Sequence, residues 1–407
     1  MNKKVIAVFT GNRAEYGLQL PVLRAIEAHE QLDYRLIVSG AHLDSDFGST
    51  LREIREDGFE PHAEVRIDMD KDSLNATAQA IGSGVLSMSK VLEEMSPDML
   101  VVYADRFEGF AAVIASSQMG IPTAHIEGGD LTEGGALDDS VRHAMTKLSH
   151  LHFTTNLQAT NRIIAMGEEP WRVHTVGFPA IDLIEAGSVE TSERLSARFE
   201  LDYNRPIVLF TQHSVATEFE KAGEQIDQSL LALSRLAGEG IQVIITYPNN
   251  DAGGREIISR LEAFGDEGLE NIQIYPSLGR YTYHGFLSLA TNENVRFSCV
   301  GNSSSGIKET PVFGCPTVNI GSRQLGRLRA ENVIDVDYDE HEIFSKIKFS
   351  LFDENFRRFS KFCTNPYGLG DAGDKIAKVL AGTVIDKKLI RKRMMLRGEM
   401  SEDGWCR

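Results

Sequence analysis

The stretch VIAVFTGNRAEYGLQLPVLRAIEAH, residues 5–29, contains one complete structural unit of the chain. It begins with an apolar run, VIAVFT, that is short enough for a buried strand. After the turn TGNRAEYG, apolar residues recur at helical spacing through LQLPVLRAIEAH. A strand that leads directly into an amphipathic helix is the building block of parallel sheets covered by helices on both faces. This stretch therefore predicts a doubly wound α/β fold.

The same alternation continues along the chain in two series of apolar runs. Runs of this length, bounded by Gly, Pro and Asp, suit parallel strands that are buried on both faces. Turn residues without a strand pattern separate the two series and indicate a linker at residues 177–190. We expect strands at residues 5–10, 34–40, 98–105, 121–128, 151–155 and 173–178, and then at 206–212, 241–249, 272–276, 295–302, 316–321 and 332–337.

Length and composition narrow the class of protein. A chain of 407 residues is too long for one ordinary core and predicts two domains, with a ligand cleft between them. The net charge of −17 argues against a nucleic-acid partner, because phosphate binding needs a basic surface. No apolar run is long enough for a signal sequence or a membrane span.

The four cysteines have no metal or redox spacing and are expected to be reduced thiols in a cytoplasmic protein. The basic tail, residues 386–400, favours an exposed or docking helix over a membrane or partner site.

Two strand ends in the first half carry residues that suit an anionic ligand. Gly11 and Arg13 place a guanidinium near free N–H groups, although a purely structural turn is an equal alternative. This turn is neither a Walker loop nor GxGxxG, so it predicts no nicotinamide cofactor. Asp105 and Arg106 lie where an open sheet presents residues to a ligand. The structural alternative is that Asp105 caps a helix beginning near Glu108.

The segment GNSSSGIKETPVFGCP, residues 301–316, is the most informative part of the second half. A Gly-Ser loop follows a strand there, and a helix is expected to begin near Ser304. Its hydroxyl and N–H groups suit a diphosphate, and Glu309, within that helix, can reach a ribose. A simple serine cap would need only one of these residues. His213 and Arg323 follow other expected strands, and for His213 a ligand-binding and a structural role are equally supported.

The glycine-rich loop HIEGGDLTEGGALDDSVRHA, residues 125–144, is crowded with carboxylates. Such a loop holds a cation, carries out acid–base chemistry or faces water. No HxH, HExxH or EF-hand spacing accompanies it, so we predict no metal site. The carboxylates are Glu127, Asp130, Glu133, Asp138 and Asp139.

Taken in order, these segments resemble the UDP-N-acetylglucosamine 2-epimerase family, in particular its hydrolysing branch from sialic-acid and legionaminic-acid pathways. The resemblance implies the GT-B fold, with a Rossmann-like sugar domain at 1–178, a Rossmann-like nucleotide domain at 179–365, and a C-terminal helix and tail at 366–407 that cross back to the first domain. The matching segments are TGNRAEYG, ADRFEGFAA, PTAHIEGGD, DDSVRHAMTKLSHLHF, VGFPAID, YPNND, GNSSSGIKE, FGCPTVNIGSRQLGR and NPYGLGDAG.

The resemblance also implies a set of site residues. The family's catalytic carboxylates correspond to Asp105, Glu127 and Asp138, with Asp139 as the neighbouring alternative to Asp138. His213 is expected to support the leaving phosphate. The implied nucleotide site consists of Arg13, Arg106, His213, Asn249, Ser303, Ser304, Glu309 and Arg323.

The implied reaction inverts C2 of a nucleotide-linked 2-acetamido sugar and releases the nucleoside diphosphate. The C2 hydrogen becomes removable by a carboxylate once the C1–O bond breaks and positive charge develops beside it. Elimination gives a 2-acetamidoglucal, and water then adds to give the 2-epimer. We expect no cofactor and a homo-oligomer, either a dimer or a tetramer. A non-hydrolysing epimerase, a GT-B glycosyltransferase and a nucleotide-sugar-sensing protein remain alternatives.

Overall fold

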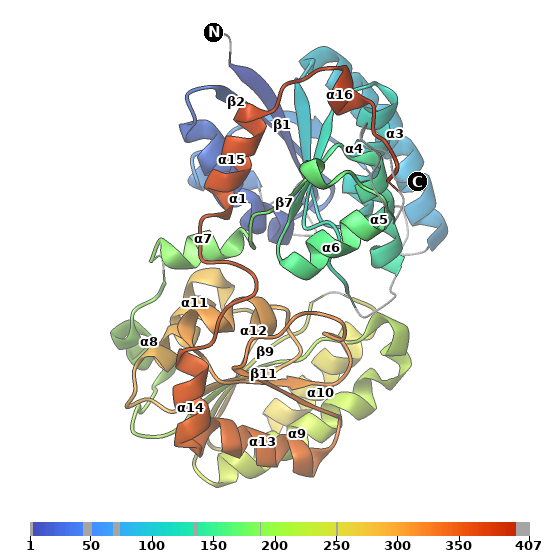
Figure 1. Cartoon of the computed structure of the whole chain (residues 1–407). Coiled ribbons are helices and arrows are strands. Elements are labelled where there is room, and N and C mark those ends of the chain that lie inside the picture. Colours follow the sequence, from blue (N-terminus) through green and yellow to red (C-terminus); the bar gives the residue numbers. More distant parts are fainter. Residues whose placement is uncertain are drawn as a thin grey trace. The chain divides into compact units, whose positions relative to one another are not determined.

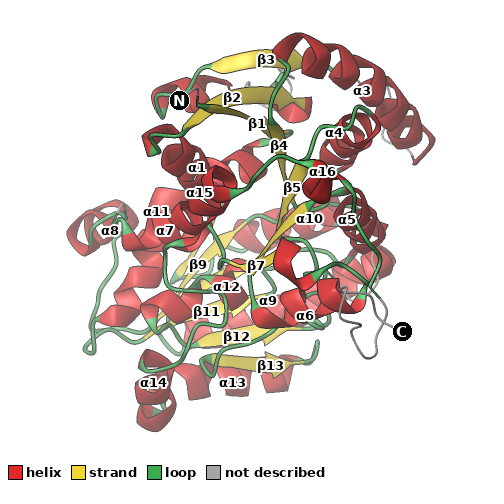
Figure 2. Ribbon diagram, turned by 45° about the horizontal axis from the view of Figure 1, so that its top comes forward, coloured by secondary structure: helices red, strands yellow, loops and turns green. Residues whose placement is uncertain are grey.

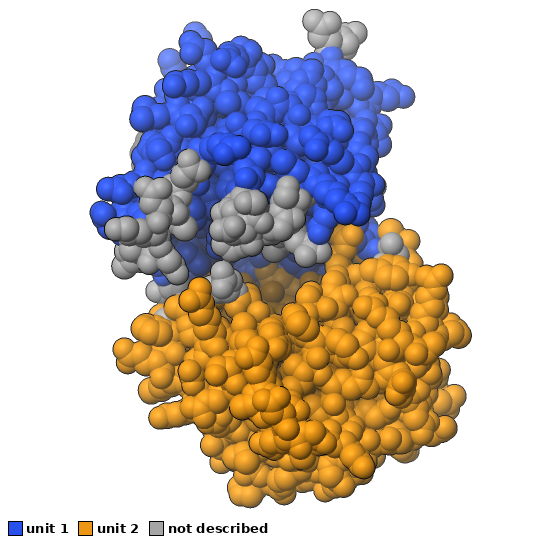
Figure 3. Space-filling model, turned by 180° about the vertical axis from the view of Figure 1, so that it is seen from behind, with its two compact units in different colours: residues 1–130, 137–183, 367–407 blue, residues 131–136, 184–366 orange. Residues whose placement is uncertain are grey.

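The computed structural model describes residues 3–43, 51–67, 74–132, 137–187, 189–249 and 251–395. The chain divides into two compact units, which are coloured separately in Figure 3. Unit 1 contains Met1–Asp130, Leu137–Leu183 and Tyr367–Arg407, and unit 2 contains Leu131–Ala136 and Ile184–Pro366. Unit 1 is thus built from both ends of the chain.

The core of unit 1 is a parallel sheet of seven strands in the order β3-β2-β1-β4-β5-β6-β7 (Figures 1 and 2). Along β1, Ile6 and Val8 pack into one apolar cluster, whereas Ala7 and Phe9 pack into a second. The sheet is therefore buried on both faces, as the continuous apolar runs predict. The strands are β1 (Lys4–Thr10), β2 (Leu32–Ser39), β3 (Pro61–Val65), β4 (Met99–Tyr103), β5 (Thr123–Ile126), β6 (Leu151–Thr154) and β7 (Val173–Thr175).

Helices on both faces complete the core of unit 1. On one face α1 packs against α15, which comes from the C-terminal part of the chain, and on the other α3 packs against α4 (Figure 1). Its helices are α1 (Arg13–Ala28), α2 (Leu51–Glu56), α3 (Leu74–Met95), α4 (Phe107–Gln118), α5 (Leu137–Leu148), α6 (Leu157–Ala165), α15 (Ala372–Gly382) and α16 (Lys387–Ile390), while α7 (Ala180–Glu185) spans the boundary between the units.

Unit 2 repeats this plan with six parallel strands in the order β10-β9-β8-β11-β12-β13. The strands are β8 (Ile207–Thr211), β9 (Gln242–Thr246), β10 (Ile272–Tyr275), β11 (Phe297–Gly301), β12 (Thr317–Ile320) and β13 (Val333–Val336). The helices are α8 (Ser192–Phe199), α9 (Ala222–Gly238), α10 (Gly254–Asp266), α11 (Gly279–Ser288), α12 (Ser305–Lys308), α13 (Glu340–Phe352) and α14 (Glu354–Lys361).

The strand order reverses once in each sheet, and these reversals locate the ligand-binding edges. In unit 1 the chain leaves β1 on one side towards β2 and returns on the other as β4. In unit 2 the corresponding neighbours of β8 are β9 and β11. Open α/β sheets bind ligands outside the carboxyl ends of the strands at such reversals. A ligand is therefore expected at the residues that follow β1, β4, β8 and β11.

The two-domain α/β fold is confirmed, but some local expectations need correction. Residues 61–65 form an edge strand, β3, that the apolar runs did not predict. Helix α4 begins at Phe107 with Arg106 as its N-cap, so the alternative role of Asp105 as a helix cap is wrong. Helix α12 ends at Lys308, so Glu309 follows this helix rather than lying within it. The division into a sugar domain and a nucleotide domain stays a prediction.

Candidate active site

The strand ends of β4 and β5 in unit 1 have an unusual backbone. Ala104 and Glu127 each follow one of these neighbouring strands, and both have left-handed backbone angles, with φ of 51° and 62°. Hydrogen bonds hold them there, because the Ala104 N–H donates to Ile126 O and the Glu127 N–H donates to Phe153 O, both at 2.9 Å. Left-handed residues other than glycine cost roughly 1–3 kcal/mol and cluster at functional sites.

A buried arginine, Arg142 on α5, organises the carboxylates of this region. Its guanidinium forms an ion pair with Asp105 and lies 3.5 Å from Asp139 Oδ1, although only 3% of its side chain is exposed. Burial opposes the charge of Arg142, but the carboxylates of Asp105, Glu127, Asp130 and Asp139 raise its pKa above the ordinary value. A buried cation in contact with several anions fixes their positions and balances their charge.

The two neighbouring carboxylates at the start of α5 have different environments. Asp139 is buried beside Arg142, whereas Asp138 is exposed. Asp138 nevertheless acts electrostatically on Arg106, whose pKa is raised because nearby carboxylates outweigh the effect of burial. The structure thus associates Asp139 with the buried cluster and Asp138 with Arg106. The catalytic assignment of Asp138 stays a prediction.

His125 ties the two strand ends to α5. Its Nε2 lies 2.7 Å from Ala104 O, a carbonyl that can only accept, so Nε2 carries the hydrogen. Its Nδ1 lies 3.2 Å from the Thr146 hydroxyl, which also contacts Arg142 O at 3.0 Å. Burial lowers the pKa of His125 to about 3, so the ring is neutral. The backbone of Gly128 packs against His125 and Thr146, since an added Cβ would lie 2.9 Å from His125 Nδ1.

A second pair of carboxyls lies behind the turn after β1. Glu15 Oε2 accepts from the Gly11 N–H at 2.6 Å, and an added Cβ on Gly11 would lie 3.2 Å from Glu108 Cβ. Burial raises the pKa of both carboxyls, to about 8 for Glu15. Arg106 Nε lies 3.6 Å from Glu108 Oε2. Arg13 begins α1, and its side chain lies outside the described part of the structure.

In unit 2, the buried Asn302 joins the loops after β8 and β11. Its side chain accepts from the His213 N–H at 2.6 Å and donates to His213 O at 2.8 Å. Gly301 permits this close approach, because an added Cβ would lie 1.9 Å from Thr211 O. The Asn249 N–H donates to His213 Nδ1 at 2.9 Å. Burial lowers the pKa of His213 to about 3, so the neutral ring carries its hydrogen on Nε2 and can donate it to an anion.

Arg323 joins the same loop from the residues after β12. Its Nη1 donates to Asn302 O at 3.3 Å, and its Nη2 lies 3.6 Å from Asp251 Oδ2. Asp251 also accepts from the Asn249 side chain at 2.5 Å. His213, Asn249 and Arg323, which lie far apart in sequence, are thereby brought together around Asn302.

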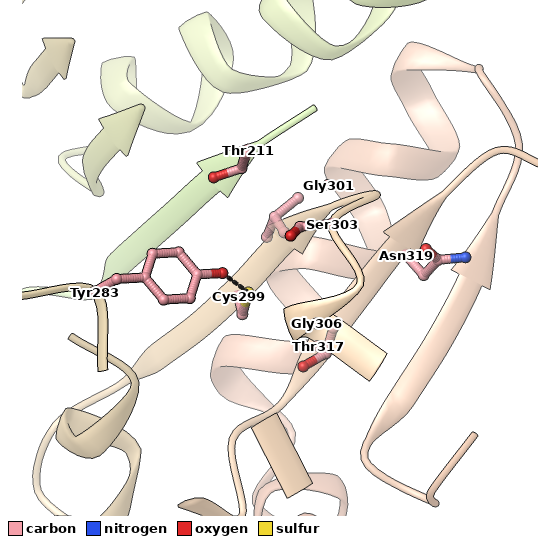
Figure 4. A pocket seen from close by; sticks show the side chains of 9 residues that line it. Thr211, Tyr283, Cys299, Gly301, Ser303, Gly306, Thr317 and Asn319 are labelled. Carbon is pink, nitrogen blue, oxygen red and sulfur yellow. Dashed lines mark hydrogen bonds between the residues drawn. The ribbon is translucent and has the colours of Figure 1, made fainter. Parts of the chain in front are cut away.

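The serine loop provides further polar groups near β11. Ser304 is the N-cap of α12, but its hydroxyl forms no capping bond. Ser303 Oγ lies 3.1 Å from Ser305 Oγ, and Tyr283 OH lies 2.6 Å from the same Ser305 oxygen. Figure 4 shows Tyr283 pointing across the adjoining cavity towards Cys299. The cavity volume, about 10 Å³, is at the lower limit for one water molecule.

Glu309, the expected ribose ligand, is held by a histidine. Its Oε2 lies 2.8 Å from His284 Nε2, and both side chains are largely buried. The two units therefore offer different chemistry. Unit 1 presents carboxylates that can move protons and stabilise positive charge, and unit 2 presents donors that suit an anionic group.

The sequence interpretation missed two central residues. Arg142 lies in the quoted segment DDSVRHA and Asn302 in GNSSSG, but neither was given a role. Their partners Asp105 and His213 are 37 and 89 residues away in sequence. A signal was present for Arg142, because an arginine one helical turn after two aspartates lies on the face of Asp138 or Asp139.

Comparison with known proteins identifies the family. The family model described as UDP-N-acetylglucosamine 2-epimerase matches residues 24–381. The chain belongs to this family. It is 32% identical to a Legionella pneumophila protein named UDP-N,N'-diacetylbacillosamine 2-epimerase (hydrolyzing), over 96% of this chain and 99% of that protein. It is 33% identical to a UDP-N-acetylglucosamine 2-epimerase of Neisseria meningitidis serogroup B, over 85% of this chain and 87% of that protein.

Solved structures support the same fold. The crystal structure of a Neisseria meningitidis UDP-GlcNAc 2-epimerase bound to UDP-GlcNAc has a TM-score of 0.78 and 20% identity, and the match covers 93% of this chain and all of that one. Membership in the family makes this chain a nucleotide-sugar 2-epimerase. Among the described helices, none is both long and apolar enough to cross a membrane.

Proposed function

We propose that this epimerase is a hydrolysing enzyme. It converts a UDP- or GDP-linked 2-acetamido sugar, such as UDP-N-acetylglucosamine, into the free 2-epimer and the nucleoside diphosphate. Its product would supply the synthesis of nonulosonic acids such as sialic or legionaminic acid. Support comes from the Legionella relative and from a Campylobacter jejuni protein named GDP/UDP-N,N'-diacetylbacillosamine 2-epimerase (hydrolyzing), which is 30% identical over 87% of this chain.

The observation that carries the proposal is the group of carboxylates around Arg142. Cleavage of the C1–O bond leaves positive charge on the sugar beside C2. A carboxylate, Asp105 or Glu127, stabilises this charge and accepts the C2 hydrogen as a proton, giving the 2-acetamidoglucal. Water then adds its oxygen to C1, and a proton returns to C2 on the opposite face. Asp138 is the proposed partner in this hydration.

Tyr103 and Arg142 set the electrostatics of these steps. Burial, together with the charge of Glu127, raises the pKa of Tyr103 well above 10, so its hydroxyl stays protonated near that carboxylate. Arg142 keeps Asp105 in place through their ion pair. The carboxylates therefore keep their positions while charge develops on the sugar, which is the condition for electrostatic catalysis.

Unit 2 is proposed to bind the nucleotide. Neutral His213 donates from Nε2 to the leaving diphosphate, and Arg323, Ser303, Ser304 and Asn249 supply further donors. Glu309, oriented by His284, accepts from the ribose hydroxyls. Arg13 and Arg106 are proposed as phosphate ligands from unit 1. No step of this scheme uses a metal ion or a nicotinamide.

The test is turnover of a panel of UDP- and GDP-2-acetamido sugars in D2O, followed by NMR. We expect free nucleoside diphosphate and a free 2-epimer with deuterium at C2, since the incoming proton comes from solvent. An epimerised nucleotide sugar without free diphosphate would assign the chain to the non-hydrolysing branch. Hydrogen retained at C2 after complete conversion would rule out elimination. Transfer of the sugar to an acceptor with C2 unchanged would indicate a glycosyltransferase. Light scattering of the purified protein tests the predicted dimer or tetramer.

A further inference from the structure

Residues 386–395 lie after α15 and include the short helix α16. We name this segment the C-terminal strap. In Figure 1 it is the red segment that contains α16 and continues from it towards α5. The fully buried Arg172 donates to Leu389 O and Lys388 O in the strap, both at 2.8 Å. Its Nε also donates to Glu169 at 2.7 Å. A buried guanidinium needs all its donors satisfied, so these bonds attach the strap firmly to unit 1.

Further along the strap, Lys392 reaches the carboxyl end of α5. Its ammonium donates to Lys147 O at 2.8 Å and to Thr146 O at 3.3 Å. The last carbonyls of a helix have no partners within the helix and carry partial negative charge, so a cation there is stabilising. Glu168 Oε2, 2.8 Å from the ammonium, balances its charge. Lys392 thus joins the end of α5 to the buried Glu168.

That helix carries Asp138, Asp139 and the buried Arg142 of the candidate site. Thr146, whose carbonyl accepts from Lys392, also places its hydroxyl against His125. His125 in turn holds Ala104, the residue before Asp105. A continuous set of hydrogen bonds therefore links the strap to the strand end that presents Asp105.

We propose that Lys392 is a positioning residue for catalysis. By fixing the carboxyl end of α5, its ammonium holds Arg142 in register with Asp105. The inference rests on the proposed function for its kinetic readout, but the structural effect on α5 is measurable without substrate.

The charge of Lys392 gives this role a distinctive dependence on pH. Burial lowers the pKa of Lys392 to about 8, against the opposing effect of Glu168. Above that pH the ammonium loses its proton, so the cap on α5 weakens. An arginine at this position would stay charged. The other titratable and charged groups that face Lys392 are Lys147, His150, His152 and Arg172.

The experiment compares Lys392→Met and Lys392→Arg with a control, Lys387→Met, an exposed lysine of the same strap. We expect Lys392→Met to lower kcat between about tenfold and a hundredfold with KM unchanged, as small displacements of catalytic groups do. Lys392→Arg should retain kcat at pH 7 and should lose less activity than the wild type between pH 7 and 9. Glu15 also titrates near pH 8, so the difference between the two profiles is the informative quantity.

Amide hydrogen exchange provides the readout that needs no turnover. Without substrate, the amides at the end of α5 should exchange faster in Lys392→Met than in the wild type or Lys387→Met. Circular dichroism identifies any variant that fails to fold, and Lys392→Arg then carries the test alone. Wild-type kcat in Lys392→Met, unchanged exchange of α5, or parallel pH profiles for Lys392→Arg and the wild type would overturn the proposal. A wild type inactive on every nucleotide sugar would refute the proposed function, while exchange of α5 would still decide the structural role of Lys392.

Discussion

Replacing Glu15 with glutamine should stabilise the protein at alkaline pH. In the wild type, burial raises the pKa of Glu15 from 4.5 to about 8, so the folded protein keeps this carboxyl protonated at neutral pH. Its Oε1 is buried and meets no donor among the described residues. Glutamine is neutral at every pH and keeps an oxygen that can accept from the Gly11 N–H.

The sign and size of the change in stability with pH follow from the protonation of Glu15 in the folded and unfolded states. Between pH 4.5 and about 8 the folded state binds a proton that the unfolded chain has released, so stability falls as pH rises. At about 1.4 kcal/mol per pH unit, the wild type loses up to about 5 kcal/mol over this interval, all of it by pH 9. The pKa of Glu108 is also raised, so the titration belongs to the pair. The glutamine variant should escape most of this loss.

The assay is denaturant unfolding from pH 5 to pH 9 for the wild type, Glu15→Gln and Glu27→Gln. Glu27 lies exposed on the same helix, so its variant should follow the wild type. Infrared spectra add a direct measurement, since a protonated carboxyl has its own C=O band. Equal pH dependence of stability in Glu15→Gln and the wild type, or a wild-type band already lost by pH 6, would refute this reasoning.

Four further substitutions test the two halves of the site. Arg142→Met leaves buried carboxylates without their cation and should destabilise the protein by about 3–5 kcal/mol in thermal or denaturant unfolding. Gly301→Ala should prevent correct folding of unit 2, because the added Cβ would lie 1.9 Å from Thr211 O; normal circular dichroism and nucleotide binding would contradict this. Glu127→Gln should mainly lower kcat, by about a hundredfold, whereas Arg323→Ala should mainly weaken nucleotide binding in calorimetry. Full kcat in Glu127→Gln would remove that residue from the mechanism.

The central strands could be predicted from sequence because they are buried on both faces. Apolar runs such as VIAVFT have no solvent-facing residues to interrupt them. The edge strand β3, PHAEV, was missed because its first four residues alternate between half-buried and exposed positions and include the charged Glu64. Edge strands carry such residues to avoid pairing with other chains, so their sequence resembles that of a loop.

Site residues at strand ends could also be anticipated, because parallel sheets present their carboxyl ends to ligands. Interactions between residues that lie on different elements of the fold could not be anticipated. Whether Asp138 or Asp139 turns inwards depends on the rotation of α5, which Arg142 and Asp105 fix together. The neutral state of His125 depends likewise on its burial in the folded protein. Such features follow from three-dimensional neighbours rather than from local pattern.

The origin of unit 1 in both ends of the chain has a consequence for its synthesis. Most of unit 2 is one continuous segment, Ile184–Pro366, and can fold as soon as it leaves the ribosome. Unit 1 must wait for its last elements, because α1 packs on α15 and Lys4 Nζ donates to the carbonyls of Ala381 and Thr383, both at 2.5 Å. During that wait the apolar face of α1 that later packs on α15 stays uncovered. We therefore expect nascent chains that stop before residue 372 to be the forms most dependent on chaperones, although they already contain every proposed catalytic residue.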